Sequence, residues 1–522
     1  MKKYLIIGVH PTPNGPLHLG HVAGPFLTLD IFHRCKKILG YDVFFISGTD
    51  SYEEHVSLKA FEENIQEYDV AQKYSDLILK DLYLLNIDLD TYLPLHNNKE
   101  SYFYYCQSIV EKILKSDSII KKNEIFPYDL WRKRYLSGGW LQGVCHLCGE
   151  DTGGFYCENC GGHHQPDEIY PHRFKYTDES NIIYLMIRSL FLMVTNKEVL
   201  KNIKGRYSNY TINMILSDIL SRKEIYLTRL TLPSTFGPKI ICPEKYFNVA
   251  FSYTVGLAAF YLMCGDVYAS KCNGENAFNV EDVKIVTAYG FDNISAYLMG
   301  MEPILQKIGY KKLTDINFVN KFLLLNGSKF STSRNHALWV RHLVEQKVIH
   351  SDLLRLIMAL NCPDKEVVDF SIETIAGTLN EFVKKWNAML YRVSCLTEWT
   401  IGFDGLGEFL ENFQSICEKD KNISRELSLF ILDMVNNSVD INDNCIFGYF
   451  LLIMYVIYPI MPSTSQLFFN DIMKCNNEYI SRDVLFSLYS CENIYKKNSS
   501  VFGELFFEEV DKMLLTKAVG VK

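Results

Sequence analysis

Two histidines near the start of the chain, His18 and His21, have the residue type and spacing of a chemical site. They follow an apolar run over residues 4–9 and a turn rich in proline, asparagine and glycine, and apolar residues then recur at helical spacing. A helix that begins near His18 places both imidazoles beside unpaired backbone N–H groups, where phosphates bind. Gly20 lacks a side chain, so a flat ring fits against the helix. The alternative is a pair of surface histidines beside a turn.

The elements around these histidines predict one parallel unit. A strand at 4–9, a helix from His18 to about Gly40 and a second strand at 41–46 follow the strand–turn–helix–strand order of such a unit. The second strand leads to Asp50, and the carboxyl ends of parallel strands are where such sheets bind ligands. Asp50 is therefore a candidate for holding a substrate ammonium group, with a helix cap as the alternative.

Four cysteines further along the chain have the spacing of a metal site. Two Cys-x-x-Cys pairs, separated by eight residues, supply four thiolates for a tetrahedron, which suits zinc. Four protein ligands leave no place for an activated water, so the predicted role is structural. A pair of disulfides and an iron–sulfur cluster are the alternatives, and His146, His163 and His164 are expected at the surface. The four candidate ligands are Cys145, Cys148, Cys157 and Cys160.

The proline-rich segment that ends at His21 resembles the first signature of class I aminoacyl-tRNA synthetases, in the form that the methionyl, leucyl, isoleucyl and valyl enzymes share. The resemblance implies that His18 and His21 stabilise the ATP phosphates while a carboxylate attacks the α-phosphorus. It also implies ATP contacts from Asn14 and Gly20. Asp50 matches the family position that holds the α-ammonium group of an amino acid.

The loop that begins at Lys329 resembles the second signature of the same family, Lys-Met-Ser-Lys-Ser. Lys329 fills the first lysine position, Ser331 matches the serine, and Thr332 stands where the second lysine is found. Such a mobile loop brings ammonium groups onto the departing pyrophosphate. The resemblance further implies that Gly290 and Asp292, which follow an apolar strand, contact the ribose of ATP.

The methionyl enzymes are the subgroup that this sequence resembles, because they carry a zinc knuckle between the halves of their nucleotide-binding fold. Residues 245–260 are also similar to the stretch that builds their amino-acid pocket. Most of the assigned pocket positions carry a different residue from that subgroup. The positions that the resemblance assigns to amino-acid binding are His10, Thr12, Asp50, Ala250, Thr254, Leu257 and Tyr297.

The fold that the resemblance implies is α/β, with a Rossmann-type parallel sheet, an inserted zinc-knuckle domain and a following α-helical bundle. Residues 66–120 read as helical, and apolar residues from Ile375 onward recur with the spacing of amphipathic bundle helices. The expected parts are the first half of the nucleotide-binding fold (1–110), the inserted domain (111–230), the second half (231–335), a junction (336–371) and the bundle (372–522).

Composition limits the class of protein. The 522 residues are 48% hydrophobic and 22% charged with a net charge of −8, which predicts several globular domains that do not wrap nucleic acid nonspecifically. The fifteen cysteines, four of them in the metal pattern, favour a reducing compartment, the cytoplasm. Only about six apolar residues follow the basic start of the chain, which is too few for a signal peptide.

The uncharged run at 445–469 is long enough to cross a bilayer, but prolines and polar residues interrupt it. A buried helix at 446–458 is expected there instead.

Together these features predict ATP-dependent activation of an amino acid as an adenylate and its transfer to tRNA. The expected cofactors are structural Zn²⁺ and Mg²⁺ bound with ATP, and no membrane partner is expected. The altered pocket and the missing second lysine favour an alternative function. In this alternative the chain is a repurposed relative that joins the adenylate to an amine or a carrier, as an amide ligase. A non-catalytic tRNA-binding relative is the third alternative.

Overall fold

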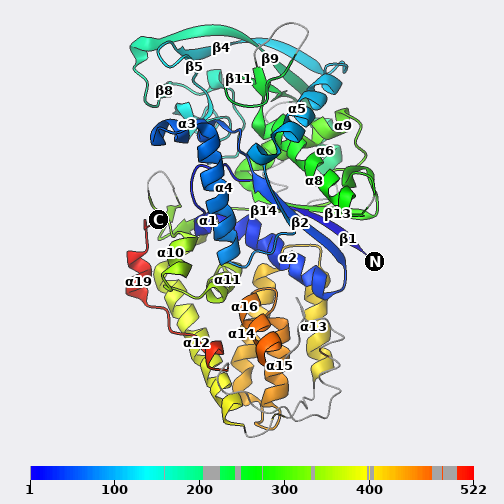
Figure 1. Ribbon diagram of the computed structural model, residues 1–522, viewed down its shortest axis with the longest axis vertical. Helices are drawn as coiled ribbons and strands as arrows, with labels where there is room; N and C mark the ends of the chain where they lie inside the picture. The colour runs from blue at the N-terminus through cyan, green and yellow to red at the C-terminus, as the bar shows by residue number, and fades with distance from the viewer. Residues whose placement is uncertain are drawn as a thin grey trace.

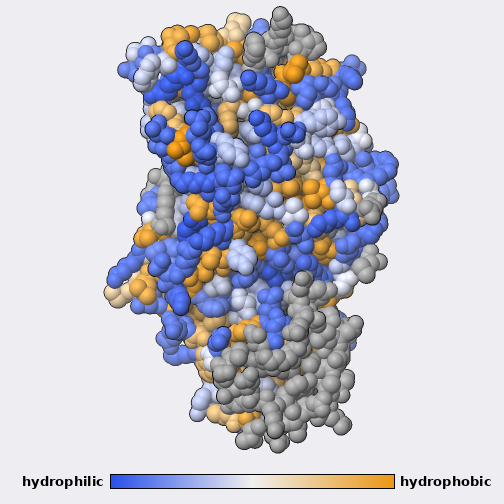
Figure 2. All heavy atoms as spheres, in the orientation of Figure 1, coloured by the Kyte–Doolittle hydropathy of each residue, from blue (hydrophilic) through white to orange (hydrophobic). Residues whose placement is uncertain are grey.

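The structure, a computed structural model, describes residues 2–157, 159–203, 221, 224–241, 248–272, 274–330, 335–396, 399, 405–472, 485 and 502–521. Its long axis runs from an antiparallel sheet, through a central parallel sheet, to a bundle of helices (Figure 1). In the view of Figure 2, hydrophilic residues cover most of the face around α3 (Glu54–Glu63) and α4 (Glu67–Leu84).

A five-stranded parallel sheet forms the centre of the molecule, which confirms the predicted α/β fold. β1 pairs with β2 on one side and with β13 on the other, so the strand that precedes the histidines lies in the middle. In spatial order the strands are β14 (Ile316–Asn320), β13 (Val283–Gly290), β1 (Lys3–Ile7), β2 (Asp42–Thr49) and β3 (Thr91–Pro94).

Helices cover both faces of this sheet, as a parallel sheet requires. The buried residues of β1 alternate between the two faces: Tyr4 and Ile6 join the hydrophobic cluster that contains α2, whereas Leu5 and Ile7 join the cluster of α5 and α8. The covering helices are α2 (Leu27–Ile38), α5 (Lys99–Ile113) and α8 (Leu257–Cys272).

The helical segment after β1 confirms the predicted strand–turn–helix–strand unit. It begins with α1 (Leu19–His21), continues through the π-helical turn η1 (Val22–Phe26) and then becomes α2. Pro25 lies inside the π-helical turn. Because proline has no N–H and its ring clashes with the preceding turn, the wider turn accommodates it without ending the helix.

The prediction that residues 66–120 are helical is wrong in two places. α4 and α5 occupy most of the range, but β3 (Thr91–Pro94) adds a short parallel strand beside β2. β4 (Ile119–Asp129) begins at the end of the range. β3 is a strand of only four residues at the edge of the parallel sheet. β4 begins with Ile119 and Ile120 and lies between β9 and β5 in an antiparallel sheet.

The segment inserted into the parallel fold contains a four-stranded antiparallel sheet and smaller sheets (Figure 1). The four-stranded sheet has the order β10 (Ile225–Arg229), β9 (Ile182–Thr195), β4 and β5 (Arg134–Tyr135), with α6 (Asn196–Ile203) after β9. The smaller sheets are β7 (Asp151–Gly153), β6 (Leu141–Val144) and β8 (Arg173–Phe174), and the pair β11 (Thr231–Pro233) and β12 (Asn248–Ala250).

The chain returns to the parallel sheet through a strand that runs into a helix, as expected for residues 245–260. β12 leads into the π-helical turn η6 (Ser252–Gly256) and α8, and residues 242–247 lie outside the described part. After β13 come η8 (Phe291–Asn293), η9 (Ala296–Met301), α9 (Glu302–Lys307) and β14. A three-stranded sheet then combines β16 (Ser328–Lys329), β15 (Leu323–Leu325) and β17 (Val368–Asp369), and α10 (Val340–Glu345) follows β16.

The C-terminal part of the described chain is a helical bundle, as predicted. The apolar positions that predicted amphipathic helices are buried: Ile375, Leu379, Phe382, Trp386 and Leu390. The expected buried helix at 446–458 is confirmed by α15, and no described helix is long and apolar enough to span a bilayer. The bundle elements are α11 (Ser351–Leu360), α12 (Ile372–Cys395), α13 (Leu406–Glu418), α14 (Ser424–Asn437), α15 (Ile446–Val456), α16 (Pro462–Leu467) and α19 (Lys512–Lys517).

Candidate active site

The sequence-predicted site residues gather at one edge of the parallel sheet. His18 follows β1, Asp50 follows β2, and Gly290 ends β13. These three strands are neighbours, so their carboxyl ends meet at the same edge, which is where such sheets bind ligands.

The two signature histidines stack on each other. The ring centroids of His18 and His21 are 3.6 Å apart and the rings are 13° from parallel. His18 is buried and His21 is exposed. Burial, and secondarily the charge of His21, hold the pKa of His18 well below its ordinary value. His18 is therefore neutral at pH 7, and its buried Nδ1 has no hydrogen-bond partner among the described residues.

The second signature and the segment that follows it contact the first signature directly. The His18 ring lies 5.3 Å from the ring of Phe330, the residue after Lys329. The N–H of Leu19 donates to the carbonyl of Leu338 at 3.0 Å. Gly20 permits this approach, because a Cβ there would lie 3.2 Å from the Cβ of Phe330.

Lys329 stands at the end of a tight hairpin. Asn326 and Gly327 have φ values of 49° and 76°, which gives an Asn-Gly turn between β15 and β16. The Nζ of Lys329 lies 3.5 Å from the ring centroid of Phe322. Ser331 and Thr332, which the second signature also assigns, lie outside the described residues.

Asp50 is a buried carboxyl at the end of β2. Its backbone N–H donates to the carbonyl of Pro11 at 3.1 Å, which fixes it beside the first signature. Its Oδ1 has no hydrogen-bond partner within the described part of the chain. Burial, together with the charge of Glu53, raises the pKa of Asp50 to about 8. The cap of the next helix is Glu53, whose side chain accepts from the N–H of His55, so Asp50 is not that cap.

Aromatic stacks surround two of the predicted amino-acid-binding residues. His10 stacks on Phe260 at 4.2 Å, and burial lowers the pKa of His10 to about 3. Tyr297 stacks on Tyr289 at 3.8 Å and accepts a 3.4 Å hydrogen bond from the hydroxyl of Tyr261. Phe260, Tyr261 and Tyr289 are not among the predicted site residues, although they lie on the same strands and helices as residues that are.

The other predicted pocket residues vary in exposure. Ala250, Thr254 and Leu257 are buried, and the hydroxyl of Thr254 donates to the carbonyl of Arg229 at 2.5 Å. Thr12 is half-buried in the loop after β1. The hydroxyl of Thr254 is thus satisfied by the backbone of β10.

The turn after β13 brings the predicted ribose residues together. Gly290 and Asp292 are both half-buried, and a Cβ on Gly290 would collide with the Asp292 carboxylate. Asn293 Nδ2 donates to Asp292 Oδ1 at 3.2 Å. The N–H of Asn14, in the loop after β1, donates to the carbonyl of Thr12 at 2.9 Å. The loop after β1 and the turn after β13 follow neighbouring strands, so both lie at the edge of the parallel sheet that carries His18.

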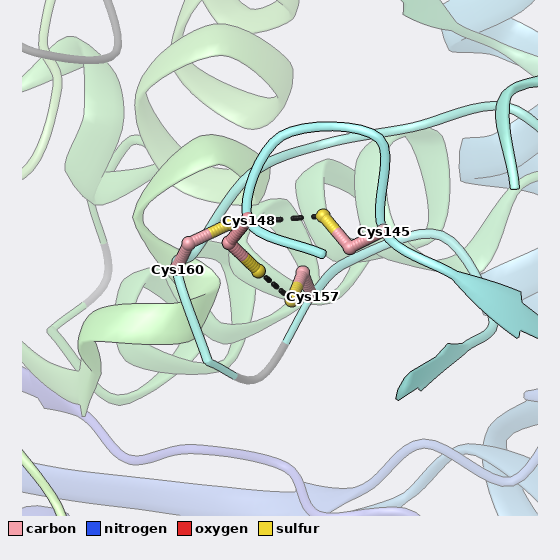
Figure 3. Close-up of side chains that lie close together, drawn as sticks. All are labelled: Cys145, Cys148, Cys157 and Cys160. Carbon is pink, nitrogen blue, oxygen red and sulfur yellow. Dashed lines mark hydrogen bonds between the residues drawn. The ribbon is translucent and has the colours of Figure 1, made fainter. Parts of the chain in front are cut away.

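The four cysteines form one compact cluster (Figure 3). All four Sγ atoms lie within 4.8 Å of one another, with Cys145 and Cys160 at 3.9 Å and Cys148 and Cys157 at 3.6 Å. A tetrahedral zinc site with Zn–S bonds of about 2.3 Å places its sulfur atoms roughly 3.8 Å apart. The donor set therefore fits Zn²⁺ bound by four thiolates, which would hold the knuckle together and leave no position for substrate.

The expectation that the histidines near this cluster lie at the surface is partly wrong. His146 is exposed and His163 is half-buried, but His164 is fully buried. The N–H of His164 donates to the carbonyl of Phe155 at 3.0 Å, which holds the backbone of His164 against the knuckle. None of the three belongs to the compact group of possible metal ligands found in the described residues.

The family model described as "tRNA synthetases class I (M)" matches residues 4–394. The methionine–tRNA ligase of Flavobacterium psychrophilum is 27% identical over 410 residues, 76% of this chain and 58% of that protein. The methionine–tRNA ligase of Methanococcus maripaludis is 26% identical over 406 residues, 77% of this chain and 59% of that protein. The chain thus spans a little under three fifths of the length of these curated relatives.

A solved structure has the same fold. Mycobacterium tuberculosis methionyl-tRNA synthetase, bound by methionyl-adenylate, superposes with a TM-score of 0.69 at 16% sequence identity. The match covers 93% of this chain and 96% of that one. At this identity the likeness establishes the arrangement of sheet, insertion and bundle.

Proposed function

The chain belongs to the tRNA synthetases class I (M) family, and from this membership we propose that it activates an amino acid with ATP and transfers it to tRNA. The observation that carries the proposal is the meeting of the two signature segments, in which the His18 ring lies against Phe330, the neighbour of Lys329. Two imidazoles and an ammonium group near one sheet edge suit a polyphosphate.

The proposed chemistry has two steps. The amino-acid carboxylate attacks the α-phosphorus of ATP, the bond to pyrophosphate breaks, and an aminoacyl adenylate forms; a tRNA hydroxyl then attacks the acyl carbon and AMP leaves. His18 and His21 stabilise the phosphates, and Lys329 stabilises the departing pyrophosphate. Mg²⁺ would accompany ATP and neutralise part of the phosphate charge. Without a protein nucleophile, catalysis consists of positioning and charge stabilisation.

In this proposal the remaining residues hold the two substrates. Asp50 pairs with the α-ammonium group, which its unpartnered buried oxygen supports. Gly290 and Asp292 contact the ribose, and Asn14 contacts ATP. The role of Ser331 in the second signature rests on the family resemblance.

We propose that the amino acid is bulkier or more polar than methionine, and that methionine is activated weakly. Relative to the methionyl subgroup, Ala250 replaces a tryptophan, Thr12 and Leu257 replace aromatic residues, and Thr254 replaces a proline. The pocket gains polar side chains where Tyr297 replaces a histidine and His10 a small apolar residue. Loss of rings leaves apolar space that a different side chain must fill. The alternative is that neighbouring rings such as Phe260 rebuild a methionine pocket.

Pyrophosphate exchange over all common amino acids tests both proposals. We expect exchange with at least one amino acid that is larger or more polar than methionine. Methionine as the best substrate would refute the specificity proposal alone, whereas exchange with none would refute amino-acid activation.

One observation favours a second candidate, an amide ligase that uses an acceptor other than tRNA. The two tryptophans of the bundle, Trp386 and Trp399, are fully buried, and Trp399 stacks on Phe447 at 4.5 Å. Neither ring is placed to stack on a base, which is how single-stranded RNA is often bound. Charging assays with total tRNA, followed by assays with candidate amines, separate the two candidates.

Further proposals concern the metal, the domains and the compartment. We propose one structural Zn²⁺ on the four-cysteine cluster, and domain boundaries near residues 110, 230, 335 and 371. A reducing compartment, the cytoplasm, is the environment that we propose, because no disulfide joins the cysteines of the described residues.

A further inference from the structure

The ammonium group of Lys329 lies over the face of an aromatic ring. Its Nζ is 3.5 Å from the centroid of Phe322, well inside the range of about 6 Å within which a cation and a ring attract each other. Both side chains are half-buried, so the contact is partly shielded from water. Partial desolvation strengthens such a contact.

Neighbouring strands and loops fix the Phe322 ring. Its backbone carbonyl accepts the N–H of Val368 at 3.2 Å, and the next residue begins β15. Its ring meets Phe291 edge to face at 4.8 Å and 72°. Phe291 in turn lies close to the cysteine knuckle. A Cβ on Gly161 would lie only 3.3 Å from the carbonyl oxygen of Phe291, so the two backbone segments are in close contact. The backbone of Phe322 is thus held by β17, and its ring packs against the ring of Phe291.

Lys329 depends on such a support more than the first lysine of a two-lysine signature would. Thr332 occupies the second lysine position, so this segment supplies one ammonium group instead of two. Lys329 also stands at the end of the β15–β16 ladder, where it pairs with Leu324. The contact with the Phe322 ring is therefore an interaction that orients the ammonium group.

We propose that Phe322 is a positioning residue, whose ring face holds the Lys329 ammonium in place for pyrophosphate. This inference rests on the proposed function for its catalytic consequence. The structural part, that the ring shields and orients the ammonium, stands on the geometry alone. The ring attracts the cation through its negative face, so another aromatic residue can replace Phe322 and an aliphatic residue cannot.

The kinetic test compares Phe322→Leu with Phe322→Tyr in pyrophosphate exchange. Phe322→Leu should lower kcat about 3- to 30-fold, the range of a partly desolvated cation–π contact, with little change in the KM for the amino acid. Phe322→Tyr should retain most of the rate. In a Lys329→Met background, Phe322→Leu should cause no further loss, because the cation that the ring holds is gone. A full additional loss in that background would overturn the proposal.

A second test needs no catalytic activity. Lys329 is labelled with an amine-acylating reagent, and its labelling rate is read by peptide mass spectrometry in the full-length chain. We expect several-fold faster labelling in Phe322→Leu than in the unmodified chain and no change in Phe322→Tyr. Phe409→Leu, which removes another half-buried ring in α13, is the matched control and should not alter the rate.

The two tests separate the possible failures. If the unmodified chain exchanges pyrophosphate with no amino acid, the proposed function fails while the labelling comparison still decides the role of the ring. Equal labelling of Lys329 in Phe322→Leu and the unmodified chain, with matching melting temperatures, would overturn the proposal that Phe322 holds the ammonium.

Discussion

Asp30 in α2 and Arg355 in α11 form a fully buried ion pair, with Arg355 Nη2 2.6 Å from Asp30 Oδ2. Arg34, one turn along α2, reaches the same oxygen at 2.9 Å. Arg355 also donates to the backbone carbonyls of Pro459 and Ile460, each at 2.8 Å. One carboxylate thus connects the helix behind the signature histidines to the bundle, and two guanidinium groups depend on it.

Asp30→Asn should lower the free energy of unfolding by about 3–5 kcal/mol, because it leaves two buried guanidinium groups without their carboxylate. Burial alone would raise the pKa of Asp30, but Arg34 and Arg355 outweigh it and lower that pKa to about 2. The stabilisation is therefore complete above the ordinary pKa of 3.8 and is lost as pH falls toward about 2. Urea unfolding from neutral to acid pH measures both effects.

The matched control for this pair is the exposed ion pair between Lys385 and Glu381 on α12. Glu381→Gln should leave the unfolding midpoint nearly unchanged, since solvent screens such a pair. An Asp30→Asn variant as stable as the unmodified chain would show that the contact between α2 and the helical bundle does not depend on this carboxylate.

Zinc should be present at one ion per chain, and its removal should unfold the knuckle. Cys157→Ser, or Cys145→Ser, should lose the metal and lower the melting temperature, because metal binding and folding of such a site are coupled. Elemental analysis of freshly purified, reduced protein measures the metal, and Cys395→Ser, at an exposed thiol outside the cluster, is the control. Reduced protein that contains no metal would contradict this prediction.

Replacing either signature histidine should slow adenylate formation. His18→Ala or His21→Ala should each lower the pyrophosphate-exchange rate about 10²-fold or more, the size of losing one oriented donor. ATP affinity should change much less, because the contact strengthens in the transition state. A double alanine variant that exchanges pyrophosphate at the normal rate would place the chemistry elsewhere.

Much of the parallel fold was predictable because its signals are local. The apolar run before His18 and the proline–glycine turn define β1 and the next helix regardless of what packs on them. The predicted helix from His18 to about Gly40 contains Pro25, but the sequence does not predict the π-helical turn around it, because apolar spacing does not distinguish a wider turn from an α-helical one. The Asn-Gly pair before Lys329 is an equally local signal, because this pair favours a tight hairpin turn.

Other features depend on tertiary partners and were missed for that reason. β3 is a strand because it pairs with β2, and its four residues carry no clear periodicity of their own. The antiparallel sheet of the insertion pairs β4 with β9, two segments far apart in the sequence. His164 is buried because the knuckle folds around it, which no neighbour in the sequence indicates. The stacking of Lys329 on Phe322 is likewise a product of the hairpin.

The pH dependence of amino-acid binding should report on Asp50, whose raised pKa of about 8 comes from burial and from the charge of Glu53. Since the pKa in the folded chain exceeds the ordinary value of 3.8, the unfolded chain releases the Asp50 proton at lower pH, and burial of Asp50 destabilises the empty folded chain as pH rises. This destabilisation is absent below pH 3.8 and grows up to about pH 8. A substrate ammonium group that pairs with the Asp50 carboxylate would offset this free-energy cost. The affinity for the amino acid should therefore depend on pH.

Amino-acid affinity should rise with pH up to about 8, by close to tenfold per pH unit, and then level off. Below pH 8 most Asp50 carboxyls carry a proton, which must leave before the carboxylate can pair with the ammonium group. Binding at pH 7 should accordingly release nearly one proton, which calorimetry in two buffers of different ionisation enthalpy detects. Asp50→Asn should bind weakly and show neither effect. Affinity that stays constant from pH 6 to 8 would remove Asp50 from the ammonium site.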